Sequence, residues 1–300
     1  MSEPVLSVVV VNWNTREWLA RCLDRVRAET RTPHEIIVVD NASTDGSHEL
    51  VATQFPGVVF LANDRNVGFA AGCNQGLELA RGRFWLLLNP DTEVLDGALD
   101  RLVAYLERHP EVAAVGPRLE NLDGSLQPSA FGFYGTCRSL VENRLVQALV
   151  PWRSPDSPWL AFWDHSSERI VDWVMGACLL VRRSVALRVG LLDERFFMFG
   201  EEVDWQWRMA EAGHRVMYLP TARVRHRKGA STSQVARPMN DHERRSRRLL
   251  VDKHLGWAGR FIYRLKAAVA AAWWALWEAG AGLFRAWMHR SPREGALPPT

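Results

Sequence analysis

The chain has 300 residues, of which 47% are hydrophobic and 24% charged, and it carries a formal net charge of +3. These values are typical of a globular protein with a sizeable core, and they argue against a disordered or fibrous chain. The length suits one large α/β domain with an appendage, or two small domains.

Cysteine usage and the first residues bear on the compartment of the protein. Four cysteines are scattered along the chain without a CxxC pair: Cys22, Cys73, Cys137 and Cys178. This spacing argues against a disulfide framework or a zinc site, and it fits a reducing cytoplasm. The opening MSEPVLSVVVVNWN has no basic segment and only a short apolar run, so we expect no signal peptide. We expect no bilayer-spanning segment before residue 260.

Residues 1–120 predict an alternation of strands and helices, which is typical of a mostly parallel sheet in an α/β protein. Short β-branched and apolar runs indicate buried strands at residues 6–11, 35–39, 58–62, 83–88 and 112–117. Apolar residues that recur every three or four positions indicate helices at residues 16–28, 47–54, 67–79 and 99–109. Thr15 precedes the first helix and is expected to cap it.

Polar residues follow four of these predicted strands, at positions 12–14, 40, 63–66 and 89–92. The carboxyl ends of parallel strands meet at one edge of a sheet, and ligands of such sheets bind there. The sequence therefore predicts a binding site along this edge.

The second half of the chain is less regular. Residues 124–168 show no periodic pattern and are rich in proline, serine and aromatic residues, so we interpret them as a functional loop or lid. Strands are then predicted at residues 170–175 and 177–182, and a helix at 184–189. A further helix begins at Glu201 and ends near Gly213, and strands at 215–219 and 222–225 precede His226.

Residues 261–288 predict a long helix rich in alanine and tryptophan, whose apolar core is interrupted by Glu278. That core of about 18 residues is at the short limit for crossing a bilayer. Because basic residues and tryptophans flank it, we expect the helix to lie on an anionic membrane surface. Packing on the domain and a homodimer contact are the alternatives. Nucleic-acid binding is not expected, since the arginines between 244 and 248 lie near acids and no known binding motif accompanies them.

Glycines recur every fourth residue in the third predicted helix, at Gly68, Gly72 and Gly76. They do not match the dinucleotide-binding fingerprint GxGxxG. Glycines at this spacing share one helix face, which allows close approach of either a neighbouring element or a ligand. Arg65 and Asn66 come just before this helix, at an N-terminus that can meet a diphosphate.

In the stretch LLLNPDTEV, Pro90 ends a predicted strand and leaves Asp91 in the loop at the sheet edge. A divalent cation on a diphosphate needs few protein oxygens, so one carboxylate is sufficient if the nucleotide supplies the rest. A plain turn is the alternative. Asp40 can accept a hydrogen bond from a ribose hydroxyl or a base imide, whereas an Asx turn that caps the next helix suits Asp45 better.

Three acids stand in one helical turn directly after the aromatic run FFMFG: Glu201, Glu202 and Asp204. Acids in the first turn stabilise a helix through its dipole, which is a structural explanation. Their place beside an aromatic run favours a functional role. His226 follows a short strand and is either a metal ligand or a structural histidine.

Seven sequence blocks, taken in order, carry a family resemblance: SVVVVNWNT, IIVVDNASTDGS, NVGFAAGCNQG, LLLNPDTEV, VDWVMGACLLVRR, FFMFGEEVDWQWR and VRHRKGAST. From Leu6 to Thr232 the chain resembles glycosyltransferase family 2 enzymes of the GT-A fold, specifically the bacterial rhamnosyltransferase-like branch. The resemblance implies a Rossmann-like GT-A domain at 1–235, with a nucleotide-sugar half at 1–120 and an acceptor half at 121–235. Residues 236–300 then form a basic, tryptophan-rich helical extension.

The resemblance implies a donor pocket made of six residues: Asn12, Asp40, Arg65, Asn66, Asn74 and Asn89. In that pocket Asn12 and Asp40 would contact the base and ribose of the sugar nucleotide. Asp91 stands at the last acid of the family's DxD motif and is the implied metal ligand, and His226 resembles the distal ligand that completes the site. Asn89 replaces the first acid of that motif and lowers the negative charge at the metal.

Glu202 stands where the family usually has the aspartate that acts as general base. The extra methylene moves the carboxylate by about 1.5 Å, a shift that matters to catalytic geometry. Glu201 and Asp204 are the alternative bases and are expected on the acceptor side. Trp173 and Gly176 match the family's acceptor-side block.

The function implied is an inverting transfer of a sugar, with rhamnose favoured. The expected donor is dTDP-rhamnose or another nucleoside-diphosphate sugar, the expected cofactor is Mg²⁺ or Mn²⁺, and the acceptor is a glycan or lipid-linked hydroxyl. The protein is expected in the cytoplasm, at the inner face of the cell membrane. A non-catalytic nucleotide-sugar-binding protein and a sugar nucleotidyltransferase are the alternatives. The latter would need a glycine-rich turn where residues 12–15 read NWNT.

Overall fold

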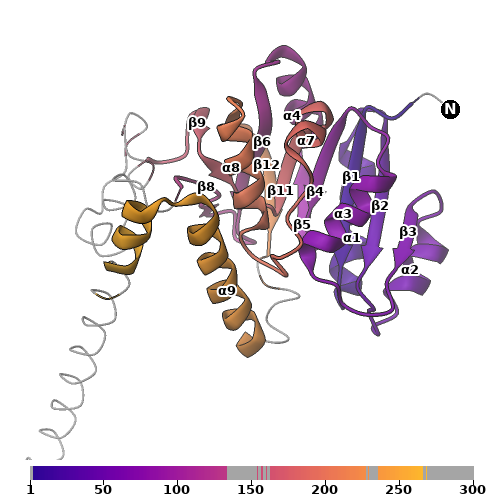
Figure 1. Cartoon of the computed structure of the whole chain (residues 1–300). Coiled ribbons are helices and arrows are strands. Elements are labelled where there is room, and N and C mark those ends of the chain that lie inside the picture. The colour runs from indigo at the N-terminus through magenta and orange to yellow at the C-terminus, as the bar shows by residue number, and fades with distance from the viewer. Residues whose placement is uncertain are drawn as a thin grey trace, which may run out of the picture. The chain divides into compact units, whose positions relative to one another are not determined.

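The computed structural model describes residues 3–133, 154, 157, 160, 163–227, 229, 236–265 and 268. The chain divides into two compact units, Met1–His254 and Leu255–Thr300. Figure 1 shows the first unit as a twisted sheet flanked by helices. The predicted domain boundary at residue 235 stays a prediction, and the helix that follows this position belongs to the first unit.

The central sheet of the described chain has ten strands, eight of them in the order β3-β2-β1-β4-β11-β6-β12-β5. Their bounds are β1 Leu6–Asn12, β2 His34–Asp40, β3 Val59–Ala62, β4 Phe84–Leu88, β5 Thr92–Leu95, β6 Val112–Glu120, β11 Cys178–Arg182 and β12 Arg215–His226. The first four strands pair in parallel, as do β6 and β12, while β11 runs antiparallel to both of its neighbours. The predicted mostly parallel α/β sheet is confirmed.

Four short strands complete the described sheets: β7 Leu126–Gln127, β8 Ala130–Phe131, β9 Arg169–Val171 and β10 Trp173–Val174. β7 pairs with β6 and β9 pairs with β12, both antiparallel, in the central sheet. β8 and β10 pair with each other in a separate small sheet. The single strand predicted at 170–175 is therefore two strands in different sheets. Much of the lid predicted at 124–168 lies outside the described residues.

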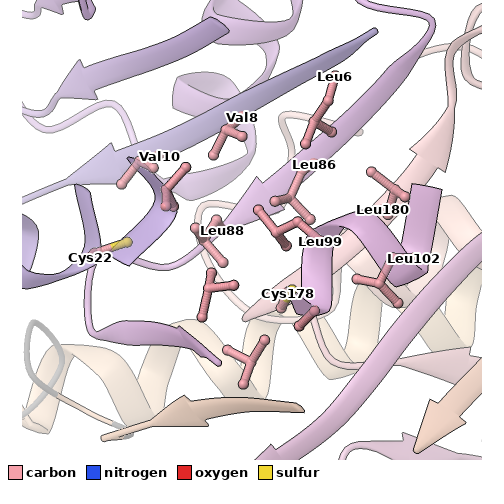
Figure 2. Close-up of a cluster of buried hydrophobic side chains, with 14 of the residues drawn as sticks. Leu6, Val8, Val10, Cys22, Leu86, Leu88, Leu99, Leu102, Cys178 and Leu180 are labelled. Carbon is pink, nitrogen blue, oxygen red and sulfur yellow. The ribbon is translucent and has the colours of Figure 1, made fainter. Parts of the chain in front are cut away.

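Helices cover both faces of the sheet. Their bounds are α1 Arg16–Glu29, α2 Ser47–Gln54, α3 Phe69–Leu79, α4 Ala98–Arg108, α7 Arg183–Val189, α8 Glu201–Glu211 and α9 Ala236–His254. Alternate residues of β1 face opposite layers, as the pleat requires. Val8 and Val10 pack in the cluster that contains Leu99 of α4, which Figure 2 shows, and Val9 packs with α3 and α8 residues.

The glycine face of α3 serves close packing on the sheet. A Cβ atom on Gly76 would lie 2.4 Å from Cγ1 of Val9, and one on Gly72 would lie 3.0 Å from Cγ1 of Val11. Both positions therefore meet strand β1, so the packing explanation is correct for them. Gly68 meets a different segment, because its Cβ would lie 2.5 Å from the carbonyl oxygen of Phe197.

Two local predictions were wrong for identifiable reasons. Thr15 stands at the N-cap of α1, but its hydroxyl donates to Oδ1 of Asn12 at 2.6 Å, and Oδ2 of Asp45 accepts from the backbone N–H of Arg16. The two strands predicted at 215–219 and 222–225 are one strand, β12, with a register irregularity between Leu219 and Arg223. A bulge keeps a strand continuous across such a break.

The C-terminal helix predicted at 261–288 lies mostly outside the described residues. Its expected roles on a membrane surface, on the domain or in a dimer are therefore not tested there. In the part of the chain that the structure describes, none of the helices combines the length and hydropathy of a membrane span.

Candidate functional site

The carboxyl ends of β1, β2 and β4 bring the predicted polar residues to one edge of the sheet. Asn12 and Asp40 are register partners at the ends of β1 and β2, and Asn89 follows directly after β4. Parallel pairing of these three strands places their ends together, as the sequence predicted.

Asn12 and Asp40 form a buried hydrogen-bonded pair. Nδ2 of Asn12 donates to Oδ1 of Asp40 at 2.7 Å, and the backbone N–H of Ser43 donates to Oδ2 of Asp40 at 2.8 Å. Nδ2 of Asn12 also donates to Oγ of Ser43 at 3.1 Å. The pair shapes the loop after β2, and its contact with a base or ribose stays a prediction.

The N-terminus of α3 follows closely after two of the predicted donor-pocket residues, Arg65 and Asn66. Oδ1 of Asn66 accepts from the backbone N–H of Gly68 at 2.9 Å and so fixes the turn into the helix. Arg65 is exposed and forms no ion pair with the described residues. A helix N-terminus with a nearby guanidinium is suited to a diphosphate.

Asn74 has a different environment, deep in α3. Its Nδ2 donates to the carbonyl of Leu192 at 2.9 Å and to Oε1 of Glu194 at 3.0 Å, and its Oδ1 accepts from the backbone N–H of Leu192 at 3.0 Å. Both amide atoms are thus engaged in holding the loop after α7. The predicted contact of Asn74 with a donor stays a prediction.

Asp91 and His226 face each other at the end of the sheet. Oδ1 of Asp91 lies 3.3 Å from Nε2 of His226, and their side chains are 7% and 5% exposed. Asn89 adds its Nδ2 at 3.4 Å from the same ring nitrogen. Antiparallel pairing of β12 with β5 brings them together, since His226 pairs with Thr92. The sequence predicted both residues as metal ligands, and the fold places them within ligand distance of one ion.

Gln127 orients the histidine, and sequence reasoning missed it. Its Oε1 lies 2.6 Å from Nδ1 of His226, and its Nε2 donates to Oδ1 of Asn121 at 2.9 Å. An amide whose nitrogen is engaged in this way accepts through its oxygen, so Nδ1 of His226 carries the proton. Nε2 then faces Asp91 at 3.3 Å. Support of this kind at one ring nitrogen is usual for a histidine that binds a metal through the other.

The acids of α8 differ in their surroundings. Oε2 of Glu202 accepts from the backbone N–H of Gly200 at 3.1 Å. Burial raises the pKa of Glu202, and the N–H groups of Gly200 and Gly176 partly oppose that rise. Glu201 is 4% exposed and its Oε2 has no partner among the described residues. Burial and the neighbouring Glu202 charge raise the pKa of Glu201 well above its usual range, so this carboxyl favours its protonated form.

Asp204 is held by partners of its own, and its contact with an acceptor or role as a base stays a prediction. Its side chain is fully buried and accepts from His254 at 2.6 Å, Lys253 at 2.8 Å and Arg208 at 3.0 Å. Burial alone would raise the pKa of Asp204, but the bonds from His254 and Lys253 lower it overall. The carboxylate is thus bonded to side chains of both α8 and α9.

Gly176 lies beside Glu202, and the residue that follows it contacts Asn89. A Cβ on Gly176 would lie 3.3 Å from Cβ of Glu202, so the missing side chain leaves room for the acid. The next residue, Ala177, accepts through its carbonyl from the backbone N–H of Asn89 at 2.9 Å. Trp173 is 8% exposed and donates from Nε1 to the carbonyl of Gly132 at 3.1 Å, and its contact with an acceptor stays a prediction.

Comparisons with known proteins agree with this geometry. The family model described as glycosyl transferase family 2 matches residues 7–148. An N-acetylglucosaminyl-diphospho-decaprenol L-rhamnosyltransferase of Mycobacterium tuberculosis is 34% identical over 269 residues, which cover 84% of this chain and 86% of that protein. A galactofuranosyltransferase of the same species is 33% identical over 219 residues, covering 71% and 66%.

A solved structure shares the fold. The mannosyltransferase of Pyrobaculum calidifontis, in complex with GDP-Man and Mn²⁺, matches with a TM-score of 0.53 at 20% identity. The match covers 96% of this chain and 84% of the mannosyltransferase.

Proposed function

The chain belongs to glycosyltransferase family 2, in its rhamnosyltransferase-like branch, and we propose that it performs an inverting, metal-dependent sugar transfer. An acceptor hydroxyl attacks the anomeric carbon of a nucleoside-diphosphate sugar from the face opposite the diphosphate. The reaction needs a proton acceptor for that hydroxyl and compensation of the charge on the leaving diphosphate. The opposed Asp91 and His226 side chains are the observation that carries the proposal.

Asp91 and His226 would hold the divalent cation, with Gln127 keeping the Nε2 lone pair of the histidine available. Bound Mg²⁺ or Mn²⁺ supplies positive charge to the leaving diphosphate. The described residues contain no group of three or more acidic, histidine or cysteine side chains that could hold a metal by themselves. Diphosphate oxygens and water would supply the other ligands, as is usual for Mg²⁺ at a nucleotide.

Glu202 would act as the general base. It must be unprotonated to accept the hydroxyl proton, and a raised pKa makes its carboxylate a stronger base than an exposed glutamate. The N–H of Gly200 holds Oε2 of this carboxylate and so fixes its orientation. Glu201, buried without a partner and favouring the neutral form, avoids a second negative charge beside it.

The donor would lie along the sheet edge from Asn12 to the N-terminus of α3. Asp40 and Asn12 stand at the carboxyl ends of β2 and β1, where a base and ribose would bind in such a sheet. The exposed Arg65, beside the positive end of the α3 dipole, suits the diphosphate. We take L-rhamnose as the transferred sugar and a lipid-linked glycan as the acceptor, on the strength of the mycobacterial relative.

A screen of nucleotide sugars tests the proposal. With Mn²⁺ present, dTDP-rhamnose should raise the midpoint of thermal unfolding more than the UDP-hexoses, because a ligand of the folded state stabilises it by mass action. It should also be the sugar nucleotide from which an N-acetylglucosaminyl-diphospho-lipid triggers nucleoside diphosphate release. Stabilisation by a UDP-hexose alone would reject the rhamnosyl donor, and stabilisation by no sugar nucleotide would reject the proposed site.

We also propose that the second unit contacts an anionic membrane surface, from the cytoplasmic side. Trp257, Phe261 and Leu265 are 85%, 63% and 54% exposed and recur every fourth residue. That spacing puts them on one helix face, and Arg260 and Arg264 are exposed beside them. An apolar stripe flanked by arginines suits the boundary between headgroups and acyl chains.

Vesicle sedimentation tests this surface. The protein should bind vesicles that contain anionic lipid and bind zwitterionic vesicles weakly. Joint substitution Trp257→Ala and Phe261→Ala should weaken binding by about tenfold or more, since burying such a side chain is worth about 1.5–3 kcal/mol. Leu187→Ala is the matched control, because Leu187 is 58% exposed on α7 in the first unit. Equal binding by the double variant and the control would contradict the proposal.

A further inference from the structure

The loop that leads into Glu202 is held by a helix far along the chain. We propose that α9 positions the general base, with Ser246, Leu250 and His254 as positioning residues that fix the 196–200 loop and the first turn of α8. Figure 1 shows α9 beside α8. The inference rests on the proposed role of Glu202 as the base.

Two residues of α9 contact the loop directly. Oγ of Ser246 donates to the carbonyl of Met198 at 2.9 Å, and Ser246 is only 5% exposed. Leu250 is 3% exposed and packs so closely on Gly200 that a Cβ there would lie 2.8 Å from its Cδ1. Both contacts fall within four residues of Glu202. A shift of α9 would therefore move the backbone that carries the base.

The backbone of this loop needs external support. Phe199 has φ of 69° and Gly200 has φ of 91°, so two successive residues are in the left-handed region. This backbone conformation is unfavourable for a phenylalanine, and it is kept only where surrounding contacts stabilise it. On one side of the loop, the N–H of Phe69 in α3 donates to the carbonyl of Phe197 at 2.7 Å. The contacts from Ser246 and Leu250 hold the loop through α9.

The end of α9 fixes the first turns of α8. Nε2 of His254 lies 2.6 Å from Oδ1 of the fully buried Asp204, two residues after Glu202. The ring of Trp207 stacks on the ring of His254, with their centroids 4.6 Å apart. The same Trp207 ring also stacks on Phe133, with a centroid distance of 4.1 Å. Polar and aromatic contacts from one residue of α9 thus set the position of α8 about its axis.

This arrangement concerns catalysis as well as folding, because a base that is misplaced by about 1 Å can lose 100-fold in rate. Asn12 and Asp40 hold each other at the ends of β1 and β2, and Gln127 of β7 holds His226. Because these supports come from other elements, loosening α9 should spare the donor and metal side. The expected signature is a loss of kcat without a matching loss of donor affinity.

Steady-state kinetics of Leu250→Ala and Ser246→Ala test the proposal. Leu250→Ala should lower kcat about tenfold or more and Ser246→Ala by less, while KM for the sugar nucleotide stays within about twofold. Leu250→Met, which conserves volume, should recover most of the rate. Glu243→Ala is the control, because Glu243 lies exposed on α9 and pairs only with Arg247 among the described residues. A parallel rise in KM, or normal kcat in folded Leu250→Ala, would overturn the proposal.

A double-mutant cycle separates positioning from general destabilisation. In a Glu202→Gln background there is no base to position, so adding Leu250→Ala should lower the residual rate of nucleoside diphosphate release by less than twofold. The same tenfold loss in both backgrounds would overturn the role of α9 while leaving Glu202 as the base. Full turnover by Glu202→Gln alone would instead refute the proposed base, which is a distinguishable result.

Discussion

Replacing Glu202 with glutamine should lower the rate of sugar transfer by about 100- to 10,000-fold, the usual contribution of a general base. The amide has nearly the shape of the acid and can keep the contact with the N–H of Gly200. Nucleotide binding should therefore remain within about twofold. Transfer measured by nucleoside diphosphate release, beside binding measured by calorimetry, checks both expectations.

Glu201→Gln is the matched control for that substitution. Glu201 favours its neutral form, so a neutral amide changes its charge little, and the rate should fall much less than in Glu202→Gln. Loss of transfer in Glu201→Gln with normal turnover in Glu202→Gln would exchange the roles of the two acids. Asp204 does not enter this comparison, because its carboxylate is fully buried and bonded to Arg208, Lys253 and His254.

The pH dependence of kcat gives an independent check on Glu202. The base works unprotonated, so kcat should fall as the pH drops through its pKa in the enzyme–substrate complex. Burial raises the pKa of Glu202 in the free protein. The fall of kcat at low pH should therefore occur above the pH range in which an exposed glutamate titrates, about 4.3. The limb should vanish from the residual rate of Glu202→Gln. A limb that persists in this variant would belong to another group.

Removing the Asp91 carboxylate should have an effect of similar size. Asp91→Asn and His226→Ala should each abolish stimulation by Mn²⁺ and lower transfer by about 100-fold or more, because charge compensation at a leaving group is worth several kcal/mol. Asp96→Asn is the control, since Asp96 is 62% exposed and pairs with Arg223 of β12. Chelation followed by readdition of Mn²⁺ should restore the unmodified protein and the control. Transfer that is insensitive to chelation would contradict the metal site.

Gln127 provides a milder test of the same site. Gln127→Leu keeps both proposed ligands but removes the acceptor that holds the proton on Nδ1 of His226. Affinity for Mn²⁺ in the presence of nucleoside diphosphate should fall by about 10- to 100-fold, as for other residues that support a metal ligand. Gln127→Glu retains an acceptor and should lose less. Equal affinity in Gln127→Leu and the unmodified protein would show that the tautomer is fixed by other means.

Local patterns were sufficient for much of the fold. The strands at β1, β2 and β4 are continuous apolar runs, and α1 and α4 repeat their apolar residues at helical spacing. Both signals depend on residues a few positions apart, so no tertiary information is needed to read them. Parallel pairing of these strands then follows from the short connections, and it places Asn12, Asp40 and Asn89 at one edge.

Local patterns failed where a residue had two available partners. Thr15 has the right type and position for a helix cap, but its hydroxyl bonds to Asn12 and the capping falls to Asp45. The glycine spacing of α3 was compatible with close approach of either a ligand or a strand. In the structure, Val9 and Val11 of strand β1 lie against Gly76 and Gly72. Such choices depend on what the fold brings near, which spacing alone does not specify.

The sequence by itself determined the α/β class and the sheet edge at which Asn12, Asp40 and Asn89 stand, because these follow from short-range patterns and strand order. Only the tertiary structure decided which distant side chains meet. Gln127 reaches His226 across 99 positions through the pairing of β7 with β6, and His254 reaches Asp204 across 50 positions through the packing of α9. Contacts between residues so far apart in the sequence depend on how whole helices and strands pack. The strand repeat of two residues and the helix repeat of 3.6 residues carry no information about that packing.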